Sequence, residues 1–140
     1  SAPQIRFPDC YGIDMSRMKD FIAFRAAVSL INDRNGMDGL LDRVYGKCID
    51  LPDAEDNFVK EIYEPFTDQE ISDKIAAIIT SENIEAEVHL IYQTVQNLHL
   101  SCPAHKGDWY FTGDFPTEGG IRVVNKAFAN YMQGKLERAY

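Results

Sequence analysis

Apolar residues recur every three or four positions over several stretches of this chain, which is the spacing expected of amphipathic helices. This spacing predicts one helix over residues 16–33, which stops at the turn-forming pair Asn35-Gly36. A second amphipathic helix follows, and Gly46 is predicted to end it as a left-handed cap. Its apolar positions are Met37, Leu40, Leu41, Val44 and Tyr45.

Two more helices are predicted in the middle of the chain. A short helix covers residues 58–63 and is cut off before Pro65. Thr67 and Glu70 then stand at the spacing of a capping box, in which each side chain bonds the backbone N–H of the other residue. A helix is therefore predicted over residues 68–79. Its apolar face carries Ile71, Ile75, Ile78 and Ile79.

Two patterns compete over residues 84–98. Helical spacing would give one continuous helix with Ile84, Val88, Ile91, Tyr92, Val95 and Leu98 on its apolar face. Strict alternation would instead give a short strand, with Val88, Leu90 and Tyr92 on one face and His89, Ile91 and Gln93 on the other. In the second interpretation, Thr94 caps a helix from residue 95 to about 101.

The two ends of the chain carry different patterns. Residues 1–13 are predicted to be extended, because Pro3 and Pro8 push the residues before them towards β or polyproline geometry. Residues 103–120 are predicted to be irregular, with aromatic residues among glycines and prolines. A last helix is predicted from about residue 120 to 134.

Length and charge narrow the class of protein. Residues 1–140 are enough for a single domain, and a hydrophobic share of 45% is enough for a packed core. A net charge of -8 argues against a nucleic-acid partner, because phosphate binding needs clustered Lys and Arg. No apolar run approaches the ~20 residues of a membrane span, and no signal peptide is recognised. We therefore expect a cytoplasmic protein with no membrane partner.

The three cysteines favour free thiols over a disulfide framework, because they are odd in number and widely spaced. Cys102 and His105 have a Cys-x-x-His spacing, but zinc needs about four ligands. The remaining candidates form no second close pair, so no metal site is predicted. They are Cys10, Cys48, His89 and His99.

Three further features are each better explained by structure than by chemistry. Glu55 and Asp56 are an adjacent acidic pair, but they lie in a polar loop at 49–56 rather than at the end of an apolar strand. The Gly113-Asp114 turn precedes a helix. Glu118 lies at the N-terminus of that helix, where its negative charge would repel an anion. The aromatic residues at 109–115 fit a small core that holds an irregular loop. No catalytic, cofactor-binding or metal-binding residue is assigned.

Three blocks in the chain resemble the amidophosphoribosyltransferases. The first runs from Ser1 to about Val28 and contains Tyr11-Gly12-Ile13-Asp14, which follows a proline-rich segment and precedes a helix. The second is Glu87 to Leu98, which is similar to a short strand and helix of that family. The third is Phe111 to Glu118, which is similar to a Phe-Thr-Gly-x-Tyr-Pro-Thr-Glu stretch near the C-terminus of that family. The blocks stand in the family's order and cover about half the chain, whereas residues 34–82 resemble an insertion without an assigned role.

The resemblance favours one of the two patterns that compete over residues 84–98. It implies a strand followed by a helix over residues 84–101, and it implies that the chain is an excised C-terminal fragment of a larger enzyme. The expected fold is thus α+β and mainly α-helical, with several amphipathic helices, a short strand near 88–92 and an extended N-terminal segment. The alternative is a non-enzymatic helical interaction module.

The resemblance also implies a function for the parent enzyme. That enzyme would use Mg²⁺ and glutamine-derived ammonia to convert phosphoribosylpyrophosphate into phosphoribosylamine in purine biosynthesis. This fragment would be structural and inactive alone, with no cofactor of its own. Some family members hold an iron–sulfur cluster through cysteines, but the matching positions here are Asp9, Gly107 and Tyr110, and Cys10 is displaced by one residue. No iron–sulfur cluster is therefore expected.

The partner implied by the resemblance is the missing transferase core of the same chain. Separation from that core would uncover apolar surface, for which Phe7, Tyr11, Ile13 and the apolar face of helix 16–33 are the candidates. Exposed apolar patches promote association. We therefore expect the isolated chain to form a homo-oligomer through this face, or its N-terminal segment to be disordered if no partner covers it. The alternative is that the helical domain buries these residues internally.

Overall fold

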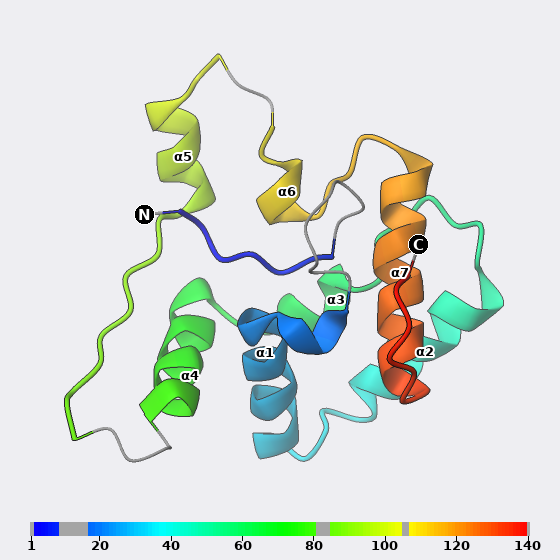
Figure 1. Ribbon diagram of the computed structural model, residues 1–140, viewed down its shortest axis with the longest axis horizontal. Coiled ribbons are helices and arrows are strands. Elements are labelled where there is room, and N and C mark those ends of the chain that lie inside the picture. The colour runs from blue at the N-terminus through cyan, green and yellow to red at the C-terminus, as the bar shows by residue number, and fades with distance from the viewer. Residues whose placement is uncertain (1, 9–16, 81–84, 105–106, 140) are drawn as a thin grey trace.

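The computed structural model describes residues 2–8, 17–80, 85–104 and 107–139. Within these ranges the chain is all helical and contains no strand (Figure 1). The elements in chain order are η1 (Met18–Asp20), α1 (Ile22–Asp33), α2 (Leu40–Asp50), α3 (Lys60–Tyr63), α4 (Asp68–Thr80), α5 (Val95–Ser101), α6 (Trp109–Thr112) and α7 (Glu118–Met132). No helix in the described ranges has the length and apolar character needed to cross a bilayer.

The hydrophobic core lies between two packed helix pairs. Helix α1 packs on α4, and α2 packs on α7. Figure 1 shows these pairs on opposite sides of the core, with α3 between them. Phe24 of α1 and Phe128 of α7 are both fully buried, and their rings meet edge to face at a centroid distance of 6.1 Å. The two pairs therefore share one core.

The helix predicted over 16–33 is divided in two. Phe21 has an extended backbone (φ -91°, ψ 113°) and separates η1 from α1. Phe21 and Met18 are both buried, so the bend brings both side chains into the core. Periodicity alone could not show this break, because both segments keep their apolar residues at helical spacing.

Helix α2 begins and ends later than the sequence pattern predicts. Met37 lies in a left-handed turn (φ 46°), and the helix starts only at Leu40. Gly46 does not end the helix, which continues to Asp50. Cys48 continues the buried stripe of Leu40 and Val44, because a free cysteine packs as a small hydrophobic residue.

The capping box predicted for α4 is confirmed. The Thr67 Oγ1 accepts a hydrogen bond from the Glu70 N–H at 3.1 Å, and the Glu70 Oε1 accepts one from the Thr67 N–H at 3.2 Å. Ile71 and Ile75 of α4 are fully buried. Helix α7 ends two residues before Gly134, whose φ of 68° supplies the left-handed turn.

The predicted strand near residues 88–92 is wrong, and so is the α+β fold class. Residues 87–94 have no regular secondary structure, although Val88, Leu90 and Tyr92 are less exposed than His89 and Ile91, as alternation predicts. A strand requires a ladder of backbone hydrogen bonds to a neighbour. This segment makes one such bond to the N-terminal segment, from the Gln93 N–H to the Ala2 carbonyl oxygen at 3.2 Å.

The helix predicted after residue 94, with Thr94 as its cap, is confirmed. Thr94 Oγ1 accepts a hydrogen bond from the Asn97 N–H at 3.0 Å and caps α5 over Val95–Ser101. The continuous helix over 84–98 is therefore also wrong. Helix α5 buries no residue, and Figure 1 shows it apart from the packed helix pairs.

The expected apolar surface at Phe7 is not present. Phe7 is buried in the chain's own core, where its ring lies 5.4 Å from that of Tyr63 in an edge-to-face arrangement. Much of the apolar face of α1 is also buried, including Phe24 and Ile31. Tyr11 and Ile13 lie outside the described residues.

Candidate functional site

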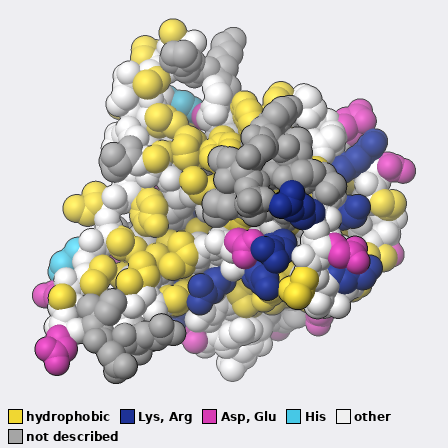
Figure 2. All heavy atoms as spheres, viewed as in Figure 1, with side chains coloured by type: hydrophobic (Ala, Val, Ile, Leu, Met, Phe, Trp, Pro, Cys, Tyr) yellow, Lys and Arg dark blue, Asp and Glu magenta, His cyan; other side chains and the backbone are white. Residues whose placement is uncertain are grey.

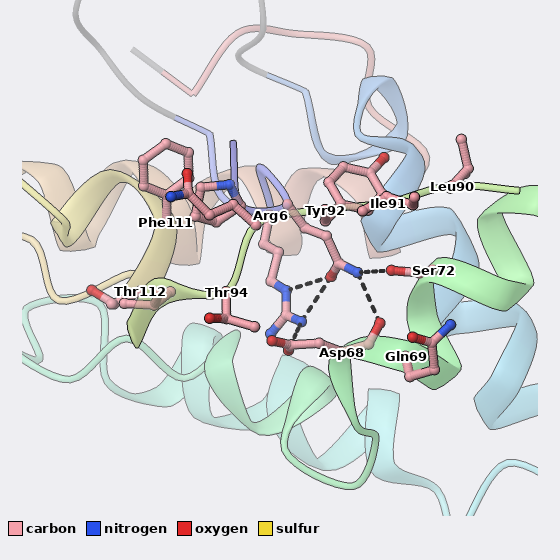
Figure 3. Close-up of a pocket in the computed structure, with 14 residues that line it drawn as sticks. Arg6, Asp68, Gln69, Ser72, Leu90, Ile91, Tyr92, Thr94, Phe111 and Thr112 are labelled. Atoms are coloured by element: carbon pink, nitrogen blue, oxygen red, sulfur yellow. Dashed lines mark hydrogen bonds and ion pairs between the residues drawn. The ribbon is translucent and has the colours of Figure 1, made fainter. Parts of the chain in front are cut away.

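A cavity of about 260 Å³ lies where the N-terminal segment crosses α4 and the segment before α5 (Figure 3). Gln4 and Arg6 form one wall, because side chains two residues apart in an extended segment point to the same side. Asp68 and Ser72 of α4 lie opposite them. The cavity is thus built from parts of the chain that are more than 60 residues apart in sequence.

Gln4 is the buried centre of this polar wall. Its Nε2 donates to the Ser72 Oγ at 2.8 Å and to the Asp68 carbonyl oxygen at 3.0 Å. Its Oε1 accepts from Arg6 Nε at 3.1 Å and from Arg6 Nη2 at 2.8 Å. Buried amides are stable only when they are hydrogen-bonded, and this one has donor and acceptor partners on both sides.

Arg6 is held by three groups besides Gln4. Its Nη2 lies 2.7 Å from Asp68 Oδ1, and Figure 3 shows the guanidinium pointing towards that carboxylate. The guanidinium carbon also lies 5.0 Å from the ring centre of Tyr63, whose hydroxyl donates to the Arg6 carbonyl oxygen at 2.7 Å. Burial raises the pKa of the Tyr63 hydroxyl well above its usual range, with Arg6 opposing that shift. Tyr63 therefore remains a hydrogen-bond donor at neutral pH.

The remaining walls come from two later segments. Leu90, Tyr92 and Thr94 precede α5, and Phe111 and Thr112 belong to α6. The described lining residues offer hydrogen-bonding groups and aromatic surface, and they contain no Cys, His or Lys. The geometry is suited to holding segments or a polar ligand in place. It brings no nucleophile and base together among these residues.

Sequence reasoning missed this network, although a signal was present. Gln4 and Arg6 are two polar residues on one face of a segment predicted to be extended. Polar side chains on one face, with apolar Phe7 and Pro8 nearby, indicate a segment that packs on other parts of the chain. The partners Asp68 and Ser72 could not be found without the tertiary structure.

The cysteines are free thiols where the structure describes them. Cys48 is buried and Cys102 is exposed, and neither forms a disulfide, as predicted. Burial, with a smaller effect of the Glu61 carboxylate, raises the pKa of the Cys48 thiol to about 12. Cys10 and His105 lie outside the described residues, so the Cys102–His105 pairing is not defined. The described ranges contain no group of three or more His, Cys, Asp or Glu residues arranged for a metal ion.

Glu55 and Asp56 are exposed in the loop between α2 and α3, as predicted. The loop is fixed through its backbone rather than through these carboxylates. Asn125 Nδ2 donates to the Asp56 carbonyl oxygen at 2.9 Å, and Asn125 Oδ1 accepts from the Phe58 N–H at 3.1 Å. The acidic pair therefore forms a solvated loop.

The Gly113–Glu118 stretch is a helix end followed by a helix start. Gly113 ends α6 with a φ of 80°, and its carbonyl oxygen accepts from Asn57 Nδ2 at 2.9 Å. Thr117 Oγ1 caps α7 by accepting from the Gly120 N–H at 3.2 Å. Glu118 Oε2 pairs with Arg122 Nη2 at 3.2 Å. This stretch is the turn and cap that the sequence favoured.

The aromatic residues at 109–115 form the predicted small core. The ring of Trp109 lies 5.4 Å from that of Phe115 and 6.0 Å from that of Tyr110. The prediction of a wholly irregular segment is wrong here, because Trp109–Thr112 form the short helix α6. Of the positions compared with cluster ligands, Gly107 precedes α6, Tyr110 lies within it and Asp9 lies outside the described residues.

The cavity, the buried amides and the helix caps are thus all formed by residues of this chain. Gln4, Arg6 and Asp68 form one connected polar group. Comparison with protein-family models, with curated proteins and with solved structures found no match to this chain.

Proposed function

We propose that this chain is the C-terminal region of an amidophosphoribosyltransferase and has a structural role in that enzyme. The parent enzyme would use Mg²⁺ to make phosphoribosylamine from phosphoribosylpyrophosphate and glutamine-derived ammonia. The region described here would cover the transferase core and stabilise it, with no catalytic residue of its own. Its place of action would be the cytoplasm.

The observation that carries this proposal is the meeting of the three resembling blocks. Ala2 of the first block accepts the backbone hydrogen bond from Gln93 of the second block. Phe7 of the first block packs so closely on Gly113 of the third that an added Cβ would lie 2.7 Å from its ring. Blocks that act together in one structure are expected to be in contact, so this arrangement supports a shared origin.

The polar network gives residues 34–82 a role within the same proposal. Asp68 and Ser72 belong to these residues, and they bind Gln4 and Arg6 of the first block. The segment would therefore fasten the N-terminal part of this region. A region held together in this way is suited to supporting a neighbouring domain rather than to a catalytic role.

An interaction module is the second candidate, and exposed apolar side chains favour it. Ile91, in the segment before α5, is 86% exposed, and Leu100 of α5 is 80% exposed. Exposed apolar surface can mark a binding site. Contact with a transferase core would cover such a surface equally well, so the parent sequence has to distinguish the two candidates.

The decisive experiment is to obtain the coding sequence upstream of residue 1 and to assay the encoded protein. The proposal expects a strand followed by two aspartates and a Gly/Thr-rich loop, a pattern that binds the ribose phosphate through backbone N–H groups. The longer protein should release pyrophosphate from phosphoribosylpyrophosphate in the presence of glutamine and Mg²⁺. The isolated 140-residue chain should release none.

A matched control is the longer protein with both upstream aspartates changed to asparagine, which should lose pyrophosphate release while keeping its thermal stability. Removal of this C-terminal region should lower the thermal stability. An upstream sequence without the strand and loop, or an inactive longer protein, would favour the interaction module. Pyrophosphate release by the isolated chain would overturn the structural role.

A further inference from the structure

Residues 87–93 form an extended segment that lies beside the packed helices without belonging to a sheet. Figure 1 shows this segment at the margin of the molecule, on the path from α4 to α5. Val88, Leu90 and Tyr92 are partly buried, and the last two pack against the hydrophobic core. Ile91, which lies between them, is 86% exposed. The segment therefore turns one face to the protein and the other to solvent, as an edge strand does.

The inner edge of this segment faces the N-terminal segment. The Gln93 N–H donates to the Ala2 carbonyl oxygen at 3.2 Å, and no backbone–backbone hydrogen bond involves residues 87–92 within the described ranges. In an extended segment, the N–H and C=O groups of successive residues point to opposite edges. Residues an even number of positions before Gln93 therefore share its inner edge. The residues that direct their backbone groups to the outer edge are Val88, Leu90 and Tyr92.

This outer edge has the properties of a surface that pairs with another strand. Unpaired edges are templates for pairing, and proteins commonly protect them with Lys or Pro, neither of which occurs in residues 85–94. The exposed face carries an ion pair between His89 Nε2 and Glu87 Oε1 at 3.0 Å, so opposite charges offset each other there. Figure 2 shows hydrophobic side chains gathered on the same side of the molecule, between α4 and α5.

We propose that this outer edge pairs with the same edge of a second copy of the chain, as antiparallel strands related by a twofold axis at Leu90. A twofold axis brings identical surfaces together and makes the two strands antiparallel. Leu90 then lies opposite its own copy, and Val88 lies opposite Tyr92 of the second copy. Each of these pairs exchanges two backbone hydrogen bonds. This surface is separate from Phe7, which is buried in the chain's own core.

The side chains favour this register over its neighbours. With the axis at Leu90, the partly buried apolar residues lie opposite one another, and His89 lies opposite Ile91, so like charges do not meet. An axis at His89 would place two imidazoles opposite each other. An axis at Ile91 would place Val88 opposite Thr94, whose side chain caps α5. The proposal stands whether or not the chain belongs to a transferase.

Measurements on the unchanged chain test the proposal first. Sedimentation velocity from about 10 µM to about 1 mM should show a monomer–dimer equilibrium. Over the same range, the amides of Val88, Leu90 and Tyr92 should become more protected from hydrogen exchange, whereas those of His89 and Ile91 should not. A chain that stays monomeric throughout, or protection confined to other regions, would overturn the proposal.

Proline substitutions test which edge pairs. Val88→Pro should weaken the dimer by at least about tenfold, because it removes a donor from the outer edge and places the proline ring against the second copy. His89→Pro is the matched control, because its N–H lies on the inner edge and has no partner within the described structure. Both variants should keep the parent circular dichroism spectrum, since neither position is helical. Equal weakening by the two prolines would contradict an outer-edge pairing.

Disulfide cross-linking tests the register. In a chain that also carries Cys10→Ser and Cys102→Ser, Leu90→Cys should form a covalent dimer in a glutathione redox buffer. The facing Cα atoms of a hydrogen-bonded pair lie about 5.5 Å apart, which suits a disulfide. His89→Cys should cross-link at least about tenfold more slowly, because its copies lie diagonally at about 7–8 Å. Cross-linking at residue 89 as fast as at residue 90 would refute the register.

Discussion

Single amide side chains join segments of this protein that are far apart in sequence. Gln4 binds the start of α4, Asn57 binds the end of α6, and Asn125 of α7 binds the backbone of the loop before α3. Irregular backbone has no helical partners for its polar groups, so side chains must supply them when it is buried. Gln4 therefore fastens the N-terminal segment to α4, whereas Asn57 and Asn125 hold loop backbone in place.

At this scale, two glycines should respond in opposite directions to alanine. Gly46 lies inside α2, and a Cβ there would meet nothing within 4 Å. Gly46→Ala should raise the free energy of unfolding by about 0.5–1 kcal/mol, because alanine has less freedom to lose in a helix. Gly113 has a φ of 80°, and a Cβ there would lie 2.7 Å from Phe7 and Asn57.

Gly113→Ala should accordingly lower the free energy of unfolding, by about 1–3 kcal/mol from backbone strain and further through the displaced ring. Urea denaturation of both variants beside the parent chain is the measurement. The prediction fails if the two substitutions change stability in the same direction.

Side-chain caps mark the starts of α4 and α5, but the two helices differ in how far they pack on the rest of the protein. The Thr67–Glu70 capping box opens α4, which packs on α1 and buries Ile71 and Ile75. Hydrogen bonding to the Thr67 backbone N–H lowers the pKa of the Glu70 carboxyl, and Arg34 adds to this shift. The Thr94 cap opens α5, which buries no residue.

Removing the same type of cap from these two helices should therefore have different consequences. Thr67→Ala should lower the global free energy of unfolding by about 1 kcal/mol, because α4 is part of the cooperative core. Thr94→Ala should change it by less than about 0.5 kcal/mol, and should instead speed amide hydrogen exchange within Val95–Ser101. Equal losses of global stability in the two variants would show that α5 unfolds together with the core.

The whole molecule depends on buried groups that must stay protonated. The pKa of Cys48 is raised to about 12, and that of Tyr63 is raised still further above its usual range. Ionisation of either group would place a negative charge within the core, which burial disfavours. Cys48 lies on α2 and Tyr63 on α3, and the burial of both side chains makes the stability of the core sensitive to alkaline pH.

Stability should consequently fall at high pH. Below about pH 9 both states keep these protons, so the two groups add no pH dependence. Above the ordinary pKa values of 9.0 for Cys48 and 10.0 for Tyr63, the unfolded state releases protons that the folded state retains. The free energy of unfolding should therefore decrease as pH rises from about 9 to 12.

Urea denaturation across this pH range would measure the decrease. Cys48→Ala and Tyr63→Phe should each show a shallower decrease than the parent, after allowance for the lower stability that each change causes at pH 7. A control change at the exposed Cys102, Cys102→Ala, should keep the parent slope. Identical slopes in all four proteins would contradict the assignment.

The sequence by itself determined most helices of this protein and how they begin. The helical spacing of apolar residues predicted the bulk of α1, α4 and α7, and Thr67 and Thr94 marked helix starts correctly. These features depend on residues within one helical turn of each other, so a local pattern contains the relevant interactions. The free state of Cys48 and Cys102 was also predictable from their spacing.

The tertiary structure decided every feature that needs a distant partner. The alternation over residues 88–92 was real, but no neighbouring strand pairs with it in the described structure, so it remained extended and irregular. Phe21 interrupts the first predicted helix with an extended backbone, and its side chain is buried in the core that the other helices complete. Gln4, Arg6 and Asp68 become one network only when α4 packs beside the N-terminal segment, because a sequence pattern cannot specify contacts across more than 60 residues.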